Sequence, residues 1–267
     1  MTNTIRAGIG GWTFEPWEGT FYPDKLAKTK QLAFAAGKLK TIEVNGTYYS
    51  TFTAATYAKW ASQVPEDFVF ALKGNRFITN RKILGTAEES LSRFLKSGIA
   101  ELGSHLGPLV WQFANTKKFE HADFASFLEL LPASHEGVAL RHAVEVRHPS
   151  FETPEFVVLC RKHKVAICHA DHAAYPEIAD ITADFVYSRL QKGSDTISTA
   201  YNPADLNRWA DIAKTWASGN QPQGLTYGDP ATITKTTPRD VFLYIIHEGK
   251  VNAPQGAMAL QKIVDEN

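Results

Sequence analysis

Short apolar runs that end in polar residues recur along this chain, and longer amphipathic stretches separate most of them. Apolar runs of about four to eight residues bounded by turn signals are typical of buried strands. Eight such runs are predicted as strands, at residues 5–9, 41–45, 68–73, 109–113, 143–147, 165–171, 185–190 and 241–247. Strands that alternate with helices in this way favour an α/β fold, specifically a parallel TIM (β/α)8 barrel.

The stretches between the runs carry the helical period. Helices are predicted over residues 29–38, 53–63, 88–103, 121–131, 154–163, 203–217 and 255–265. In the third of these, Leu95, Ile99 and Leu102 recur at steps of four and three residues and are expected on one helix face. Thr86 to Glu89 resembles a capping box that would begin this helix.

The end of the chain is expected to be less regular. Asn202-Pro203 predicts a helix start, because proline suits the first helical turn. The interval 191–240 is longer than one helix needs, so irregular structure is expected in the last units.

Strand parity predicts which polar side chains meet. Residues two apart on a strand point to the same side, so Glu43 shares a face with Asn45. Tyr187 shares a face with Arg189 in the same way. If these faces point inward, the barrel mouth holds Glu43, Asn45, Lys73, Gln112, Glu145, Arg147 and Arg189. The alternatives are that some faces point outward, or that the ions form a purely structural network.

Size and composition narrow the protein class. The 267 residues suit one barrel or two small domains, and no linker divides the chain, which favours a single domain over residues 1–267. Lys+Arg and Asp+Glu are equal at 28 each, which argues against a globally basic nucleic-acid binder but allows a local basic patch.

The cysteine content and the apolar runs bear on the cell compartment. Two cysteines, Cys160 and Cys168, make no disulfide framework, and Cys168 in its apolar run is expected to be a buried small hydrophobe. No secretory signal is evident, and no run approaches the ~20 apolar residues that span a bilayer. A soluble cytoplasmic protein without a membrane partner is expected.

Several short motifs follow one another along nearly the whole chain. They are Gly8-Ile9-Gly10-Gly11-Trp12, Trp17-Glu18-Gly19, Phe21-Tyr22-Pro23, Thr41 to Tyr49 (Glu-x-Asn-x-Thr-aromatic-Tyr), Pro65 to Lys73, Arg76-Phe77-Ile78-Thr79, Leu106 to Phe113, Glu145 to Ser150, and Tyr187 to Leu190. Together they resemble the domain of unknown function 72 family, also called YecE-like. The resemblance implies a TIM-type barrel of the xylose-isomerase-like kind, and it supplies no established reaction.

The chain departs from the family pattern at three places on loops expected to rim the pocket. Asn80 stands where the family has His after Ile-Thr. Gln191-Lys192 stands where the family continues Arg-Leu with His-Gly. Ile246-His247 stands where an Asn-Asn pair follows the last strand.

The predicted chemistry centres on Glu43 and Glu145 as an acid–base pair. A second carboxylate or an apolar pocket raises the pKa of a carboxyl group, whereas a nearby cation lowers it. Lys73 is a candidate Schiff-base nucleophile or electrostatic clamp, and arginines suit a carboxylate or phosphate. The predicted catalytic residues are Glu43, Lys73, Glu145 and Arg189; the predicted substrate-binding residues are Trp12, Asn45, Tyr48, Gln112, Arg147, His148, Asp171 and Tyr187.

No cofactor is predicted, but a divalent metal remains an alternative. The available ligands are Glu43, Glu145, His148, His169, Asp171 and His247. His169 and Asp171 would share one strand face, whereas the neighbouring lysine and arginines would repel a cation, and no His-Glu-x-x-His motif is present. Gly8-x-Gly10-Gly11 lacks the spacing of a dinucleotide fingerprint and predicts a tight turn instead.

Three functions follow from these patterns. The first is an enzyme (isomerase, lyase or hydrolase) for a small anionic, sugar-like or phosphorylated substrate, bound at the mouth. The second is a nucleic-acid-binding or endonuclease-like protein, for which Lys28, Lys30, Lys38, Lys40 and residues 76–82 offer local positive charge. The third is a barrel that binds a ligand without catalysis.

Overall fold

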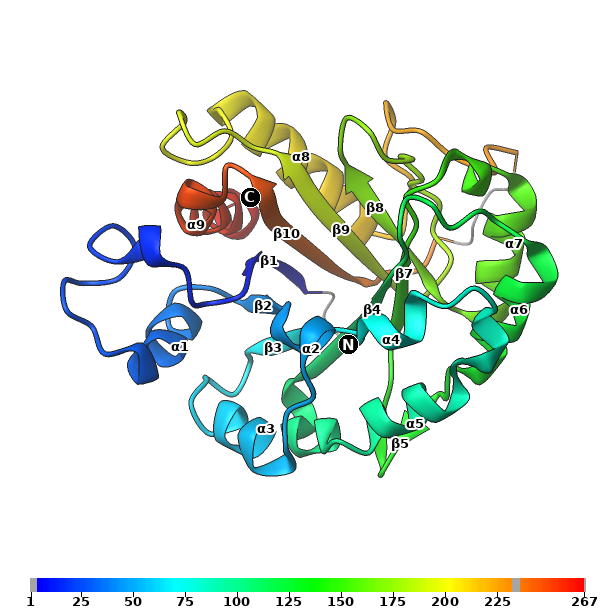
Figure 1. The fold of residues 1–267 in the computed structure, drawn as a ribbon. Coiled ribbons are helices and arrows are strands. Elements are labelled where there is room, and N and C mark those ends of the chain that lie inside the picture. Colours follow the sequence, from blue (N-terminus) through cyan, green and yellow to red (C-terminus); the bar gives the residue numbers. More distant parts are fainter. Residues whose placement is uncertain (1–3, 232–235, 267) are drawn as a thin grey trace.

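A closed ring of eight parallel strands forms the centre of the protein in the computed structural model, which describes residues 4–231 and 236–266 (Figure 1). The strands are β1 (Ile5–Gly10), β2 (Thr41–Val44), β3 (Val69–Lys73), β4 (Leu106–Gln112), β7 (His142–Glu145), β8 (Ala166–Asp171), β9 (Phe185–Lys192) and β10 (Asp240–Glu248). Around the ring their order is β1-β10-β9-β8-β7-β4-β3-β2. This arrangement confirms the predicted TIM-type barrel.

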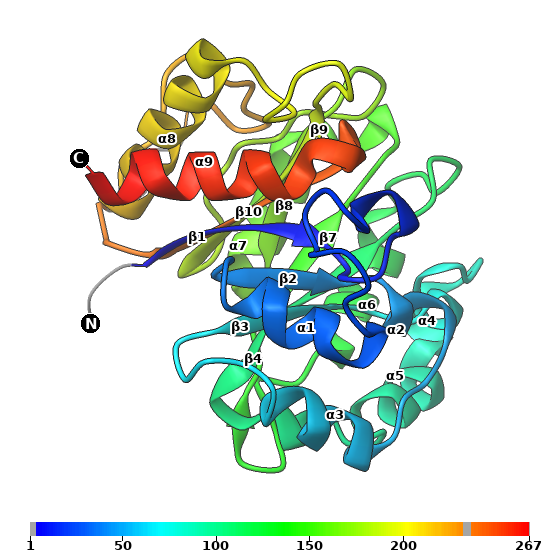
Figure 2. The ribbon, with the colours of Figure 1, turned by 90° about the vertical axis from the view of Figure 1, so that its left-hand side faces the viewer.

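Helices surround the ring. The larger ones are α1 (Lys28–Ala36), α3 (Ala54–Ala61), α5 (Glu88–Leu95), α6 (His121–Leu130), α7 (Pro154–His163), α8 (Pro203–Ala217) and α9 (Ala253–Glu266). Two short helices, α2 (Gly46–Tyr49) and α4 (Arg76–Thr79), follow the C-terminal ends of β2 and β3 and lie at that end of the barrel (Figure 2). Among the described residues, no helix has both the length and the apolar character needed to cross a bilayer.

Two connections depart from the regular strand–helix alternation. A small antiparallel pair, β5 (Ser134–His135) and β6 (Val138–Ala139), precedes β7. Residues 172–184, between β8 and β9, contain no helix. The described part of the interval 191–240 holds α8 and otherwise irregular chain, as predicted.

The predicted helix over 88–103 is confirmed only over α5, because the chain leaves the helical path after Leu95. Gly98 adopts a left-handed conformation (φ 104°), and a 3-10 helix, η3 (Ile99–His105), follows. The predicted capping box is wrong: Ala87 is the N-cap, and the Thr86 hydroxyl donates to the Ile83 carbonyl instead. The prediction for α8 is confirmed, since Asn202 accepts a hydrogen bond from the Asp205 amide.

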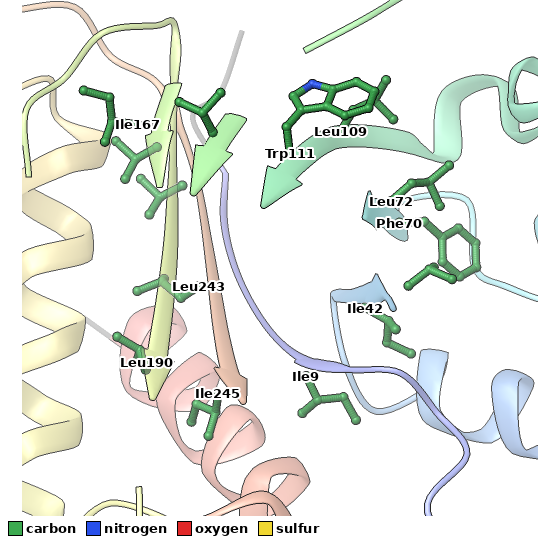
Figure 3. Packing of buried hydrophobic residues seen from close by; sticks show 14 of the residues in the cluster. Ile9, Ile42, Phe70, Leu72, Leu109, Trp111, Ile167, Leu190, Leu243 and Ile245 are labelled. Atoms are coloured by element: carbon green, nitrogen blue, oxygen red, sulfur yellow. The ribbon is translucent and has the colours of Figure 1, made fainter. Parts of the chain in front are cut away.

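Each strand packs two different surfaces, as its alternating side chains require. The outward side chains form the main core against the helices, and Ile42, Phe70, Leu72, Trp111 and Ile245 are among them (Figure 3). The inward side chains fill the ring with small residues beside large aromatic ones: Ala71, Val110, Ala143, Ala166, Cys168, Phe185, Tyr187, Phe242, Tyr244 and Ile246. The predicted burial of Cys168 is confirmed. The N-terminal part of the ring is therefore a packed core, and the polar side chains of the predicted site lie at the C-terminal end of the ring.

Candidate functional site

A cavity of about 800 Å³ opens at the C-terminal ends of the strands. The basic side chains that line it are Lys73, Arg147, Arg189, His247 and Lys250. No aspartate or glutamate is among the lining residues in the described part of the chain. The cavity therefore presents positive charge to a ligand.

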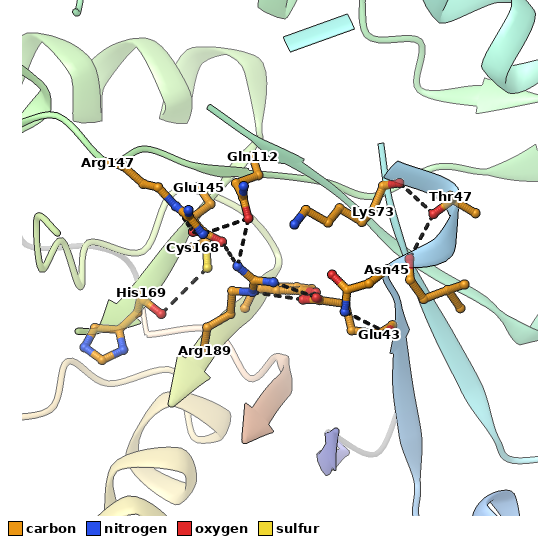
Figure 4. A network of polar contacts seen from close by, with 12 residues as sticks. Glu43, Asn45, Thr47, Lys73, Gln112, Glu145, Arg147, Cys168, His169 and Arg189 are labelled. Atoms are coloured by element: carbon orange, nitrogen blue, oxygen red, sulfur yellow. Dashed lines mark hydrogen bonds and ion pairs between the residues drawn. The ribbon is translucent and has the colours of Figure 1, made fainter. Parts of the chain in front are cut away.

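Arg189 of β9 lies between two buried carboxylates beneath this cavity (Figure 4). Its Nη2 and Nε donate to Glu43 Oε1 and Oε2 at 2.7 and 3.0 Å. Its Nη1 donates to Glu145 Oε2 on the other side of the ring. Both glutamates are fully buried, with 0% of their surface exposed. Closure of the barrel thus brings together three inward-pointing residues that are far apart in the sequence.

Three further side chains complete the hydrogen bonding of this group. Arg147 Nε donates to Glu145 Oε1 at 2.6 Å, and the Tyr187 hydroxyl donates to Glu43 Oε2 at 2.6 Å. Gln112 Oε1 accepts from Arg147 Nη2 at 2.8 Å and from Arg189 Nη1 at 3.2 Å. We call Glu43, Glu145, Arg147 and Arg189 the mouth cluster; its two negative and two positive charges balance.

The mouth cluster keeps both glutamates ionised. Burial alone would raise the pKa of Glu43, but the charge and hydrogen bonds of Arg189 outweigh it, and the pKa is lowered from its usual value. The pKa of Glu145 is lowered in the same way, with burial opposed by Arg189 and Arg147. For both carboxylates, the neighbouring cations therefore outweigh burial and lower the pKa. Carboxylates with a lowered pKa are better suited to holding Arg189 in place than to accepting protons near neutral pH.

Lys73 adds a positive charge to this balanced cluster. In the described part of the chain, no carboxylate oxygen lies within 4.0 Å of its ammonium. Burial, and then the charge of Arg189, lower the pKa of Lys73 to about 8, although Glu43 and Glu145 act in the opposite direction. The pKa of Lys73 is thus closer to neutrality than that of an ordinary lysine.

The backbone around Lys73 fixes where its side chain starts. The Thr47 hydroxyl contacts the Lys73 carbonyl oxygen at 2.6 Å, tying α2 to the end of β3. A Cβ on Gly74 would collide with the Trp111 ring, so only glycine fits directly after Lys73. The Lys73 ammonium lies 4.4 Å from the centroid of the Tyr48 ring, a cation–π contact. Tyr48 therefore supports Lys73 and is not among the residues that line the cavity.

The wall beside Lys73 combines an aromatic ring with an amide. Trp12 lines the cavity and packs edge-on against Trp60, with ring centroids 5.1 Å apart. Asn45 follows the end of β2 and also lines the cavity. A Cβ on Gly10 would lie 2.9 Å from Ile246 Cγ2 and 3.0 Å from Asn45 Nδ2, so this glycine keeps the wall open. Gly11 adopts φ 75°, in agreement with the tight turn predicted there.

Gln191 and His247 line the cavity as well. Both lie in segments expected to rim the pocket, but neither was among the predicted catalytic or substrate-binding residues. Gln191 is 2% exposed, and its Oε1 has no hydrogen-bond partner among the described residues. His247 adopts φ 74° where the pairing of β10 with β9 shifts register. Parity could have found Gln191, because it lies two residues after Arg189 on the same strand.

Besides Tyr48, three predicted substrate-binding residues lie away from the cavity lining. Tyr187 lies beneath the mouth cluster and is fully buried. His148 Nδ1 accepts from the Ser150 amide at 3.1 Å and so caps a turn. Asp171 pairs with the Lys192 ammonium at 2.7 Å.

The suggested metal pair of His169 and Asp171 does not face the mouth. Cys168 points into the ring, so its neighbour His169 points outward and packs against Trp209 and Trp216 of α8. Within residues 4–231 and 236–266, no group of three or more His, Cys, Asp or Glu side chains has the arrangement needed to hold a metal ion. The oxygen atoms of Glu43 and Glu145 are engaged by guanidinium groups.

Comparisons with known proteins agree with this architecture. A DUF72 family protein from Thermotoga maritima MSB8 superposes with a TM-score of 0.72 at 20% identity, covering 98% of this chain and 100% of that one. A crystal structure of a DUF72 family protein from Enterococcus faecalis V583 superposes with a TM-score of 0.71 at 16% identity, covering 98% and 96%. No curated protein matches the chain. Residues 6–267 match the family described as "Protein of unknown function DUF72", and the chain therefore belongs to the DUF72 family.

Proposed function

We propose that this protein is an enzyme that binds a small anionic, sugar-like substrate in the cavity at the barrel mouth. The observation that carries the proposal is the sign of the charge in the lining, which is basic throughout the described residues. The mouth cluster is neutral by itself, so the Lys73 ammonium is a surplus cation that an anionic ligand would neutralise. Arginine and lysine side chains are suited to carboxylate and phosphate groups.

The uncharged lining supports a hydroxylated ligand. The buried Gln191 Oε1 is an acceptor without a partner in the described chain, and a ligand hydroxyl would satisfy it. Asn45 offers a further amide, and the Trp12 ring offers a flat apolar surface for a sugar face. A pocket with a few convergent polar groups and an aromatic wall is the usual form of a small-molecule site.

The residues of the site divide into two roles under this proposal. Glu43, Glu145 and Arg189 fix one another and supply a preorganised charged floor. Lys73 and Arg147 reach the cavity, where Arg147 binds the anionic group and Lys73 exchanges protons or acts as a nucleophile. Isomerisation, lyase chemistry and hydrolysis all remain compatible with this set.

Thermal-shift screening with sugar phosphates and sugar acids tests the proposal. We expect at least one compound to raise the melting temperature and Arg147→Met to abolish that rise. Arg141→Met is the matched control, because Arg141 pairs with Asp240 near the N-terminal strand ends and lies outside the cavity lining. If no compound stabilises the protein, or if both variants lose the response equally, the proposal is wrong.

Product analysis separates catalysis from binding alone. With the stabilising compound, we expect conversion by the native protein and loss of conversion in Lys73→Gln. A compound that stabilises the protein but is recovered unchanged would favour the non-catalytic ligand-binding barrel.

One surface favours nucleic-acid binding as a second candidate. Beside the mouth, Tyr49 and Phe77 are each 63% exposed, and the Arg76 guanidinium lies 5.8 and 5.4 Å from their ring centroids. Exposed aromatic rings next to arginine are suited to stacking on bases. Tight binding of an abasic duplex that weakens steeply with salt, and that is lost in Arg76→Ala, would make this candidate the leading one.

A further inference from the structure

We propose that the Lys73 amine forms an imine with a carbonyl carbon of the substrate, so that the substrate is a small anionic aldehyde or ketone. This inference rests on the proposed function and names its substrate class and its covalent step. Two observations support it: Lys73 lines the cavity, and the two arginines of the site, Arg147 and Arg189, are bound to carboxylates.

Lys73 is the lysine at the floor of the cavity. It ends β3, its side chain is 7% exposed, and its amine points toward Gln112 and Arg189 (Figure 4). The Arg147 and Arg189 guanidinium groups are bound to carboxylates, whereas the Lys73 amine contacts the Tyr48 ring and has no carboxylate oxygen of the described chain within 4.0 Å. An amine without a carboxylate partner, on a cavity wall, is free to approach a carbonyl carbon.

A nucleophilic amine must be neutral, and the site makes this form more abundant than it is for an ordinary lysine. Burial and the charge of Arg189 lower the pKa of Lys73 to about 8. Relative to an ordinary lysine with a pKa of about 10.4, its neutral fraction at pH 7 is larger by on the order of a hundredfold. The geometry supplies access, and the lowered pKa supplies the reactive form.

The step conserves atoms and charge. The ammonium releases one proton, and the nitrogen lone pair attacks the carbonyl carbon while the C=O π electrons move to oxygen. Proton transfers convert the resulting carbinolamine hydroxyl to water, which leaves as the C=N bond forms. In total, one ammonium and one carbonyl group yield one iminium ion and one water molecule, and the charge stays at +1.

The surroundings suit the iminium product. The charges of Glu43 and Glu145 both favour a cation at the Lys73 nitrogen, so they stabilise the iminium ion as they stabilise the ammonium. Arg147 offers a guanidinium on the same cavity wall for a carboxylate or phosphate of the substrate. The ligand hydroxyl expected at Gln191 fits a hydroxylated carbonyl compound.

Reductive trapping tests the inference. The full-length protein is incubated with glyoxylate or with dihydroxyacetone phosphate and sodium cyanoborohydride from pH 6 to pH 9, and adducts are located by peptide mass spectrometry. We expect one reduced adduct on Lys73, forming at least tenfold faster at pH 7 than on any surface lysine. Thermal-shift measurements on the same compounds report binding separately.

Two lysine variants separate the site from general lysine reactivity. Lys73→Arg keeps the positive charge and is expected to remove the adduct. Lys192→Arg, at the end of β9 and paired with Asp171, is expected to keep it. Lys73→Gln, checked for folding by circular dichroism, provides a second variant should Lys73→Arg fail to fold.

The outcomes distinguish this inference from the proposed function. A compound that stabilises the protein but gives no adduct on Lys73 overturns the imine and leaves the proposed function standing. Labelling spread over surface lysines and unchanged in Lys73→Arg also overturns it. If neither probe binds or labels Lys73, the imine is rejected for these carbonyl classes, and the wider screen with sugar phosphates and sugar acids decides the proposed function.

Discussion

Two groups of buried ions in this protein share one arginine between two carboxylates but differ in their surroundings. At the mouth, Arg189 lies between Glu43 and Glu145, Arg147 pairs with Glu145, and Lys73 adds one positive charge. Beside α7, Arg161 pairs with Asp180 and Asp229. We call the second group the α7 cluster.

In each group, burial shifts the pKa of one member toward its neutral form. The pKa of Lys73 is lowered, and the pKa of Asp180 is raised, mainly by burial, despite hydrogen bonds from the Gly228 and Asp229 amides. The difference lies in the surroundings. Lys73 faces a cavity of about 800 Å³, whereas Asp180 borders a space of only about 10 Å³. A shifted pKa therefore points to function at the mouth and to packing beside α7.

Removing the central arginine of each group should have the largest effects and tests most directly whether the two groups differ. Arg189→Met leaves two fully buried carboxylates without their shared cation, and we expect a loss of about 3–5 kcal/mol in the free energy of unfolding. Arg161→Met should cost less, about 1–2 kcal/mol, because its side chain is partly exposed and Asp180 can take up a proton. Urea unfolding at pH 7 measures both, and equal losses would contradict the distinction.

The pH dependence of two carboxyl variants should have opposite signs. The lowered pKa of Glu43 means that its stabilisation is present above the unfolded-state pKa of about 4.3 and is lost as pH falls through the folded-state pKa. Glu43→Gln should therefore cost about 2–3 kcal/mol at pH 7, and this cost should shrink in acid.

Asp180→Asn is the matched comparison. The raised pKa of Asp180 means that stability from this group falls as pH rises above the unfolded-state pKa of about 3.9, so the variant should gain relative to the native protein as pH rises. Unfolding curves from pH 3 to pH 7 measure both differences. Slopes of the same sign would show that the two groups do not differ as described.

Lys73→Met tests whether the positive charge of Lys73 destabilises the folded protein. The lowered pKa of Lys73 destabilises the folded protein while the amine is charged, and this cost disappears as pH rises from about 8 toward 10.4. We expect the variant to be more stable than the native protein by on the order of 1–2 kcal/mol at pH 7 and to lose that advantage near pH 10. Guanidinium unfolding at the two pH values tests this, and a destabilised variant at pH 7 would show that Lys73 holds the cluster together.

Gln191→Leu should have the smallest effect on the protein alone. Its Oε1 makes no hydrogen bond in the described chain, so its loss should change the unfolding free energy by less than about 1 kcal/mol. The variant should instead weaken the ligand found by thermal-shift screening by roughly tenfold. If calorimetry shows unchanged affinity, the proposed hydrogen bond between a ligand hydroxyl and Gln191 is wrong.

The barrel and the set of inward-pointing polar side chains could be predicted from the sequence, because both follow from residue patterns within single strands and helices. Each strand ends in polar residues, and period-two parity assigned Glu43, Lys73, Gln112, Glu145 and Arg189 to the ring interior. The run Ala166–Asp171 is buried on both faces, so no alternation revealed that His169 points outward. The helix predicted over 88–103 was too long because its apolar spacing continues across Gly98, where the backbone turns left-handed.

The pKa directions could not be predicted, because they depend on contacts across the ring. Glu43 and Arg189 are 146 residues apart in the chain, and only closure of the barrel sets their distance. From the sequence alone, the pKa of each glutamate could be raised or lowered. The position of Arg189 determines that both are lowered.

Gly10 leaves a gap in the cavity wall where any larger residue would carry a side chain. A single methyl group there would press on Ile246 of β10 and on Asn45, which follows β2, so on the neighbours at both sides of β1. We expect Gly10→Ala to narrow the cavity at this point and to exclude branched ligands more strongly than unbranched ones. The missing side chain at the end of β1 thus contributes to the selection of ligands by size.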